Sequence, residues 1–400
     1  MQKHRQFKDW AVQRGVEIHD SIDSAKLPER GLGLTATQPI SKDTLVLFVP
    51  EKAMFKLDLR LLKKYNLHKT SPQSQLAFSA MIKFSAGSSV FHLWRETLPK
   101  LCNFKQCMLL YWQCQHVSSL QPDPMDSSEW DEMTPPSVKA TFKRQLADWE
   151  KDLAYVKPAL SEAGFSEENF LYYWIVVDSR SFHWKPAKPA RASGSMVLCP
   201  FIDYLNHGPT GTGCEVLQTP KGFEVVPDRD YAAGEELLIT YGAHSYDKLL
   251  VHYGFVPTPG TPDKDDSISI DHLVIPALPE DIKQRLQDTG FLGGYVLAPA
   301  ANEICFKTQV AIRAILLTCN EWEYFVTNGE DLGQDASADV TKFLEELFLQ
   351  WKGEIELKLN TTKKRIPLLE EKQGVLLLLH NRWLQITQAM TSFITGGEDI

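Results

Sequence analysis

Three polar side chains that could do chemistry interrupt an apolar stretch of this sequence. Residues 199 to 207 read CPFIDYLNH, in which Asp203, Asn206 and His207 are interleaved with large apolar residues. A buried polar group without a partner costs about 1–3 kcal/mol, so such groups are kept only where each of them finds one. A surface loop would not need the apolar residues around them. The stretch therefore predicts a buried segment whose polar groups have a specific partner.

Four further motifs carry residue types suited to chemistry, and they follow one another along the chain. They are Arg30-Gly31-Leu32-Gly33, Ser179-Arg180-Ser181-Phe182, GEELLITYG with Tyr241 near its end, and Tyr253-Gly254-Phe255. Glycines let the backbone approach a ligand closely, an arginine can form a bidentate pair with a carboxylate, and a tyrosine hydroxyl can orient a reacting group. Each motif alone also fits an ordinary role, such as the start of a hairpin or a tyrosine at a strand end.

Other chemistries find less support in the sequence. Gly31, Gly33 and Ala36 have the spacing of a dinucleotide-binding fingerprint, but that motif must follow a strand and open a helix. Here the next segment reads as β-structure and Pro39 follows within three residues. Two groups of potential ligands lack the spacing of metal sites: Cys102, Cys107 and Cys114, and His244 and His252. We therefore expect no metal site.

Taken together and in order, the motifs between residues 30 and 255 resemble the SET-domain protein methyltransferases. The pattern is similar to the Rubisco large-subunit lysine methyltransferase type, and the opening segment FKDWAVQRGVE resembles the first helix of that subgroup. The resemblance implies an α+β fold, in which a SET domain of small β-sheets carries a helical insertion and precedes an all-α C-terminal substrate-binding domain. It implies S-adenosylmethionine (SAM) as the cofactor and a non-histone protein as the substrate.

The resemblance assigns a role to each position that matches the family's motifs. Tyr241 would be the catalytic residue, which orients the lysine amine and does not need to remove its proton. The expected cofactor-binding residues are Arg30, Gly31, Leu32, Gly33, Arg180, Asn206, His207 and Phe255. The expected substrate-binding residues are Phe182, Asp203, Tyr253 and Trp184, with a purely structural role equally open for Asp203.

The predicted activity is methylation of a protein lysine. An aromatic residue at Phe182 suits an aliphatic lysine chain, whereas the related actin-histidine branch has a polar residue at that place. Lysine-rich ribosomal proteins and translation elongation factors are the expected partners, because many relatives act on them. Two alternatives stay open: protein-histidine methylation, and a catalytically silent SET-like module that binds a partner. Tyr246 and the glycine-rich loop 208–213 depart from the subgroup's pattern, which leaves the substrate's shape and the number of methyl groups open.

These motifs must be positioned by elements that can be read from the periodicity of apolar residues. Ser166, followed by two glutamates, is expected to begin a helix. The stretch 258–267, with its prolines, glycine and charges, suggests a domain boundary. The expected elements are a helix at 5–14, a β-hairpin formed by GLGLTAT and TLVLFVP, helices from about 57 to 178, strands again up to Tyr241, and long helices after the boundary. The expected domains are 1–256, with the insertion, and 257–400.

The composition is consistent with this interpretation and excludes other classes. Of the 400 residues 43% are hydrophobic, which is ample for packed cores, and the formal net charge is −9. That sign argues against direct contact with nucleic acid and suits a basic protein partner. Seven scattered cysteines do not suggest disulfides, and the polar N-terminus lacks the pattern of a signal peptide. Because no apolar run could span a bilayer, we expect a cytoplasmic protein without a membrane partner, and the nucleus stays open as a second location.

Overall fold

The computed structural model describes residues 2–28, 30–87, 89–118, 127–185, 196–258, 260, 263–368 and 372–396. The chain divides into two compact units. The first unit comprises Met1–Phe104 with Gln145–Ala243, and the second comprises Lys105–Arg144 with His244–Ile400. The boundary expected between residues 256 and 257 remains a prediction, and each unit is described by itself below.

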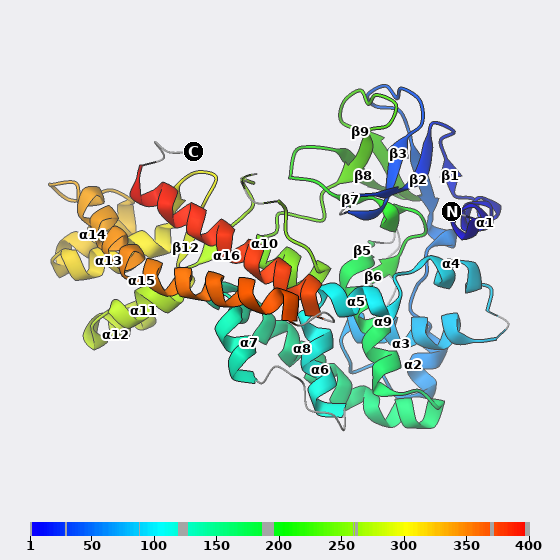
Figure 1. The fold of residues 1–400 in the computed structure, drawn as a ribbon, viewed down its shortest axis with the longest axis horizontal. Helices are drawn as coiled ribbons and strands as arrows, with labels where there is room; N and C mark the ends of the chain where they lie inside the picture. Colours follow the sequence, from blue (N-terminus) through cyan, green and yellow to red (C-terminus); the bar gives the residue numbers. More distant parts are fainter. Residues whose placement is uncertain are drawn as a thin grey trace. The chain divides into compact units, whose positions relative to one another are not determined.

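The first unit is organised around a twisted sheet and a two-stranded ribbon (Figure 1). Within the described residues the sheet has the order β1-β4-β9-β8-β10-β3-β2, and β7 pairs with β10 outside this path. The ribbon pairs β5 with β6. The strands are β1 (Glu17–Ile18), β2 (Ile22–Leu27), β3 (Gly31–Ala36), β4 (Leu47–Pro50), β5 (Ser181–His183), β6 (Met196–Leu198), β7 (Asn206–His207), β8 (Cys214–Thr219), β9 (Gly222–Pro227) and β10 (Glu236–Ile239).

The strands expected around residues 31–37 and 44–50 exist, but they do not pair with each other, so the predicted hairpin is wrong. β3 instead forms a hairpin with β2, in which Leu27 lies opposite Gly31, and its other edge pairs with β10. β4 pairs with β1 and β9. The strand β2 was not predicted from the sequence. Ile22 and Ser24 are its buried positions, but Ser24 is polar like its neighbours Asp23 and Lys26, so no alternation of apolar and polar residues is visible. Alternation predicts a strand's faces but does not identify its neighbours.

The predicted helices at the N-terminus and between the strands are confirmed. Ser166 begins a helix as expected: its side chain accepts a hydrogen bond from the Asn169 amide, and the Asn169 side chain accepts one from the Ser166 amide. The helices are α1 (Gln2–Gln13), α2 (Leu59–Lys64), α3 (Pro72–Ser85), α4 (His92–Thr97), α5 (Leu101–Cys107), α6 (Leu109–Ser118), α7 (Ser127–Met133), α8 (Pro136–Ala163) and α9 (Glu167–Arg180). The last of these ends at Arg180 and leads directly into β5, which fixes where Arg180 and Phe182 lie.

The second unit is helical around its own apolar core, as the sequence predicts, and it also contains a small sheet that the sequence did not predict. The sheet has the order β11-β12-β13. Its elements after residue 243 are α10 (Tyr246–Lys248), the π-helix η3 (Leu249–Tyr253), β11 (Ile268–Ser269), α11 (Asp271–Ala277), α12 (Glu280–Asp288), β12 (Val296–Ala298), β13 (Glu303–Ile304), α13 (Phe306–Leu316), α14 (Cys319–Asn328), α15 (Ser337–Arg365), η4 (Ile366–Leu368) and α16 (Gln373–Ile394).

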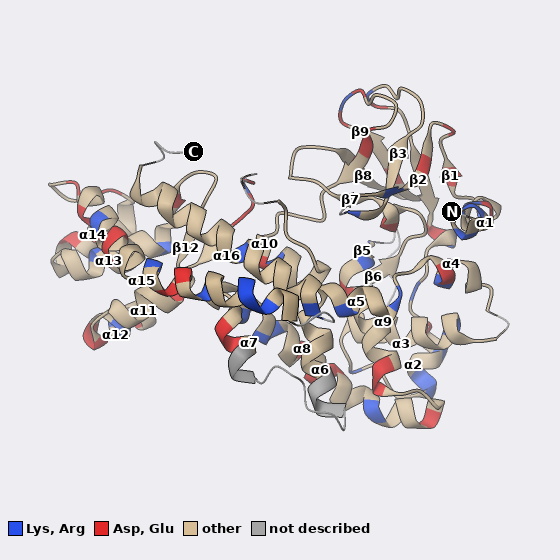
Figure 2. Ribbon diagram, in the orientation of Figure 1, with Lys and Arg blue, Asp and Glu red and all other residues tan. Residues whose placement is uncertain are grey.

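The helices α15 and α16 lie side by side over most of their length (Figure 1). Figure 2 shows charges of both signs along α15, and its last turn contains Lys363, Lys364 and Arg365. Basic side chains there are favourable because the carbonyl end of a helix carries a partial negative charge. Among the helices that the structure describes, none is long and apolar enough to cross a membrane.

Candidate active site

The apolar residues of CPFIDYLNH pack the stretch against α1, and its polar residues follow on a short strand. Phe201 stacks on Phe7 of α1 and on Tyr204, with ring centroids 5.9 and 5.0 Å apart. Phe201 also has a φ of 72°, an uncommon conformation for a bulky residue, at the turn before the 3₁₀ helix η2 (Ile202–Tyr204). The chain then enters β7, where Asn206 pairs with Leu238 of β10 in parallel register.

Asn206 is held at the meeting point of three strands. Its side-chain amide donates hydrogen bonds to the Leu32 carbonyl at 3.2 Å and to Glu236 Oε1 at 2.7 Å. Because both partners are acceptors, the Asn206 side-chain atom that faces them must be the NH₂ group. The other polar atom, Oδ1, can then accept a hydrogen bond from a ligand. Glu236 also pairs with Arg30 at 3.0 Å, and Arg30 donates to the His207 carbonyl at 2.9 Å. Glu236 is therefore a site residue that sequence reasoning missed, although it lies in the GEELLITYG motif.

Gly33 is required by the geometry of this cluster. A Cβ atom at Gly33 would lie 2.5 Å from Leu27 Cδ1, 2.9 Å from Glu236 Oε1 and 3.0 Å from Asn206 Nδ2. Any side chain there would displace the Asn206–Glu236 hydrogen bond. Gly31 has a different reason to be glycine: it has a φ of +77° at the end of the β2–β3 turn, where a Cβ atom would meet open space.

His207 and Tyr241 are joined across the sheet. The Tyr241 backbone N–H donates to His207 Nδ1 at 3.2 Å, and the two ring centroids are 5.2 Å apart. Because Nδ1 accepts, the neutral imidazole carries its hydrogen on Nε2. The Tyr241 hydroxyl donates to the Leu205 carbonyl at 2.9 Å. Burial raises the pKa of Tyr241 to about 12, with a smaller lowering effect from Arg180 and a smaller raising effect from Asp203. The phenol is therefore protonated at neutral pH.

Arg180 and Asp203 form a second, partly unsatisfied cluster. Arg180 donates to the Asp203 carbonyl oxygen at 2.8 Å, whereas its distance to the carboxylate is 3.9 Å. Burial raises the pKa of Asp203 to about 6, although Arg180 and, more weakly, the Trp94 indole act in the opposite direction. Within the described residues Arg180 Nε, Asp203 Oδ1 and Trp94 Nε1 are buried and make no hydrogen bond of good geometry.

The expected substrate residues are distributed between the two units. Phe182 and Trp184 both contact Phe223 of β9, at ring distances of 5.9 and 5.3 Å. Trp184 is 2% exposed, which is the position of a core residue and not of one that lines an entrance. Tyr253 and Phe255 belong to the second unit, at the end of η3 and just after it, and their part in the site stays a prediction.

The two features that depart from the subgroup's pattern have structural explanations. A Cβ atom at Gly213 would lie 2.6 Å from the Leu238 carbonyl, so this glycine lets the 208–213 loop pass close to β10. Tyr246 is buried, and the centre of its ring lies 5.5 Å from the Arg382 guanidinium carbon. Both features therefore serve packing within their own unit.

The arrangement in the first unit fits the amino-acid end of SAM. That end carries a carboxylate and an ammonium group, which need a cation and an acceptor. Arg180 supplies the cation, and its buried Nε has no partner among the described residues. Asn206 presents Oδ1 as an acceptor, and the backbone of β3 is accessible at Gly31, where a Cβ atom would meet open space. In the part of the chain that the structure describes, no three His, Cys, Asp or Glu side chains converge as a metal site would require.

Comparisons with known proteins point to the same family. A sequence model of the SET domain matches residues 31–242, which is more than half of the chain. The ribosomal lysine N-methyltransferase set11 of Schizosaccharomyces pombe is 21% identical over 314 residues, covering 78% of this chain and 74% of that protein. SET domain-containing protein 4 of Mus musculus is 22% identical, covering 98% of this chain and 91% of the relative. The actin-histidine N-methyltransferase of Drosophila melanogaster is 27% identical over 64% of this chain and 49% of its own length.

Solved structures share the fold at low sequence identity. The SET domain of LSMT bound to lysine and AdoHcy superposes with a TM-score of 0.62 at 15% identity, over 99% of this chain and 91% of that one. Rubisco LSMT bound to sinefungin and monomethyllysine gives a TM-score of 0.63 at 16% identity, over 100% and 92%. The family model and the shared fold lead to one conclusion: the chain belongs to the SET-domain family of SAM-dependent protein methyltransferases.

Proposed function

We propose that the protein is a protein-lysine N-methyltransferase that acts on a non-histone protein. One observation carries the proposal above the others: the Tyr241 hydroxyl is fixed by the Leu205 carbonyl in the same cluster of strands that holds Asn206 and His207. A catalytically silent module would have no need for this arrangement. The similarity to a ribosomal lysine N-methyltransferase over 78% of the chain favours lysine as the acceptor, and so does the aromatic residue Phe182.

Tyr241 is proposed to orient the substrate amine. When bound, SAM supplies a methyl group on a positively charged sulfur. A lysine with an ordinary pKa must lose its proton before it can accept that methyl, which costs roughly 4 kcal/mol at pH 7.4. Tyr241 cannot act as the base at neutral pH, because its own proton is held to about pH 12. A phenol that donates to the Leu205 carbonyl can still accept a hydrogen bond from the amine. Positioning is therefore the role proposed for it.

The remaining residues of the cluster are proposed to hold the cofactor. Arg180 would meet the SAM carboxylate, and Asn206 would accept from its ammonium group. His207 and Phe255 are proposed to lie near the adenine, and Phe182 and Tyr253 to wall the lysine channel. Trp184 is the weakest member of this set, because it is buried against Phe223.

The proposed substrate is a lysine-rich ribosomal protein or translation elongation factor. A net charge of −9 favours a basic partner, and one relative is named as a ribosomal lysine N-methyltransferase. The same charge disfavours direct contact with nucleic acid, and no contact with membranes is proposed. We place the protein in the cytoplasm, with the nucleus as the other candidate compartment.

A labelling experiment tests the proposal. The purified chain and isotope-labelled SAM are incubated with lysate from cells that lack the enzyme, and labelled peptides are identified by mass spectrometry. The proposal expects a methyl group on lysine, which is lost with Tyr241→Phe although that variant still binds SAM. A methyl group on histidine would replace the lysine proposal with the alternative suggested by the actin-histidine relatives. No detectable binding of SAM by calorimetry would support a silent module.

A further inference from the structure

A buried ion network in the second unit contacts the start of the segment that carries Tyr253 and Phe255. Arg382 of α16 is fully buried and donates from Nε to Asp247 at 2.7 Å. Its two terminal nitrogens donate to the Asp266 carboxylate at 2.8 and 3.1 Å. Asp266 in turn accepts from the Tyr246 backbone N–H at 2.9 Å. One guanidinium therefore holds the beginning of the 246–257 segment through both aspartates.

The end of the same segment is held by Gln385, which lies one turn after Arg382 on α16. Gln385 Nε2 donates to the Pro257 carbonyl at 2.7 Å, and Gln385 Oε1 accepts a hydrogen bond from Arg382 Nη1 at 3.4 Å. Arg382 and Gln385 are three residues apart, so they lie on one face of the helix. The 246–257 segment is thus attached to α16 at both ends. We call Arg382 and Gln385 the α16 clamp.

The segment between these attachments has the features of a functional element. It contains the π-helix η3, a rare form that is often found at functional sites. The π-helix is followed by Gly254, which has a φ of +74°. A Cβ atom at Gly254 would lie 2.8 Å from Cys107 Sγ. The backbone between Tyr253 and Phe255 is therefore closely defined.

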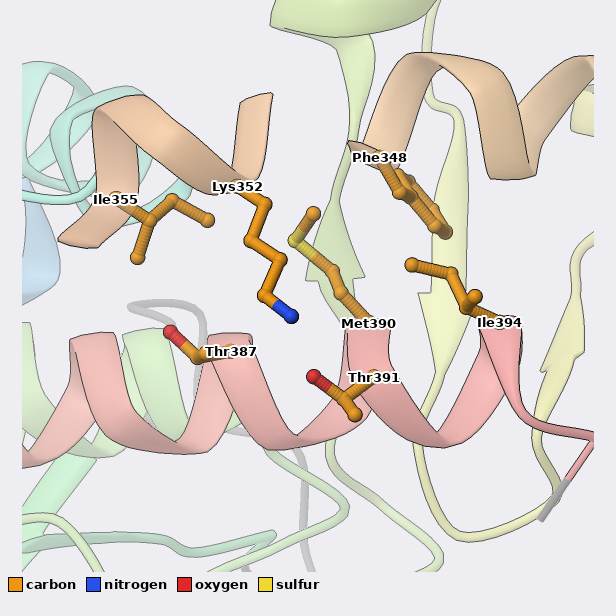
Figure 3. Close-up of a pocket in the computed structure, with 7 residues that line it drawn as sticks. All are labelled: Phe348, Lys352, Ile355, Thr387, Met390, Thr391 and Ile394. Carbon is orange, nitrogen blue, oxygen red and sulfur yellow. The ribbon is translucent and has the colours of Figure 1, made fainter. Parts of the chain in front are cut away.

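The network is poorly suited to a purely stabilising role. Burial disfavours the charged forms of Arg382 and Asp247, and the attraction between the guanidinium and the two carboxylates offsets much of this cost. Such networks are often no more stable than apolar residues of the same volume, and their best-attested use is to fix one arrangement. Elsewhere α16 packs on α15 in the ordinary way: Figure 3 shows Met390 and Ile394 facing Phe348, with the Lys352 side chain reaching toward Thr387 and Thr391.

We propose that Arg382 and Gln385 are positioning residues, which hold the 246–257 segment, and through it Tyr253 and Phe255, in the conformation that binds SAM. The inference rests on the proposed function for the roles of Tyr253 and Phe255. It gives the C-terminal helix a part in the cofactor site in addition to any contact with a protein substrate.

Two measurements on the full-length chain test the clamp. Hydrogen–deuterium exchange of peptides from 246–257 reports whether the clamp holds the segment, and calorimetry with SAM reports whether this matters for binding. Gln385→Ala should raise exchange in these peptides and weaken SAM binding about fivefold, the usual effect of one hydrogen bond. Arg382→Lys should act in the same direction, because an ammonium cannot reproduce the fork of bonds to two carboxylates. Gln385→Ala keeps the test decisive if Arg382→Lys fails to fold.

A matched control on the same helix separates positioning from general loss of stability. Trp383 donates to the Met133 carbonyl at 2.7 Å and packs against Trp351, and neither partner belongs to the 246–257 segment. Trp383→Phe should lower the melting temperature and leave both the exchange of 246–257 and the affinity for SAM unchanged. If Trp383→Phe and Gln385→Ala weaken SAM binding equally, the clamp has only a structural role and the proposal is overturned.

A double-mutant cycle tests whether the clamp acts through Phe255. Phe255→Ala should weaken SAM binding about tenfold. If Gln385 acts through Phe255, the double variant should also lose about tenfold, whereas independent effects would give about fiftyfold and overturn the proposal. Unchanged exchange in Gln385→Ala would overturn the clamp itself. A wild-type chain that does not bind SAM would refute the proposed function instead, and the exchange measurement would still decide whether the clamp exists.

Discussion

Replacing Asp203 by asparagine should make the protein more stable at neutral pH. Burial raises the pKa of this carboxyl from 3.8 to about 6, although Arg180 opposes the effect. Between these two values the unfolded chain has lost the proton that the folded chain still holds. Stability therefore falls as the pH rises from about 4 to about 6, and the loss is complete above that range. At 1.36 kcal/mol per pKa unit, the difference corresponds to about 3 kcal/mol.

Urea unfolding of the wild type and Asp203→Asn between about pH 4 and pH 8 measures this effect. Asparagine has the shape of the neutral acid, so the two proteins should be equally stable near pH 4. At pH 8 the variant should be more stable by up to about 3 kcal/mol. A variant that is less stable than the wild type by the same amount at both pH values would refute the reasoning.

Asp152 provides the matched control for this experiment. It is also a buried aspartate of the first unit, but its carboxylate accepts hydrogen bonds from the Ser71 amide at 3.3 Å, the Ser71 hydroxyl at 2.7 Å and the Trp174 indole at 3.0 Å. In asparagine an NH₂ group, which cannot accept a hydrogen bond, replaces one of the two oxygens, so at least one of these bonds is lost. Asp152→Asn should therefore destabilise the protein by about 1–3 kcal/mol at pH 8, which is the opposite sign from Asp203→Asn.

Five further substitutions, at four positions, test the cluster around β7. Tyr241→Phe should leave the SAM affinity within about twofold but reduce methyl transfer about 10²-fold or more; in the wild type the rate should not fall up to pH 10, because the pKa of Tyr241 is about 12. Glu236→Ala should weaken SAM binding about tenfold in calorimetry by freeing Asn206, and Glu236→Gln should restore part of it. Gly33→Ala should cost more affinity for SAM than Gly31→Ala, because only the former displaces the Asn206–Glu236 bond; equal losses would contradict that explanation.

The sequence predicted elements whose signals are local. Ser166 was identified as a helix start because its hydrogen bonds are made within one turn. The pairing of β3 with β10 could not be predicted, because the two strands are about 200 positions apart in the chain. The three short strands of the second unit were missed for a related reason: two or three residues such as Ile268–Ser269 carry no periodicity.

The sequence predicted those site residues that belong to a recognisable motif. It missed a residue whose role depends on its contacts in the folded chain. Asn206, His207 and Tyr241 lie together as their motifs implied. Glu236 was overlooked because an acidic residue in a strand is commonly solvated, and only the structure reveals that it joins Arg30 to Asn206. Conversely, an aromatic residue two positions after Phe182 could face either the channel or the core, and Trp184 packs in the core.

The position of β3 between β2 and β10 also has a consequence during synthesis of the chain. The β2–β3 hairpin is complete at Ala36, but its second partner begins only at Glu236. At about 5–20 residues per second, the free edge of β3 waits roughly 10–40 s on the ribosome for that strand. An unpaired strand edge invites pairing with other chains, and glycines weaken a strand as a template for such pairing. Gly31 and Gly33 would therefore serve the nascent chain before any cofactor reaches the finished site.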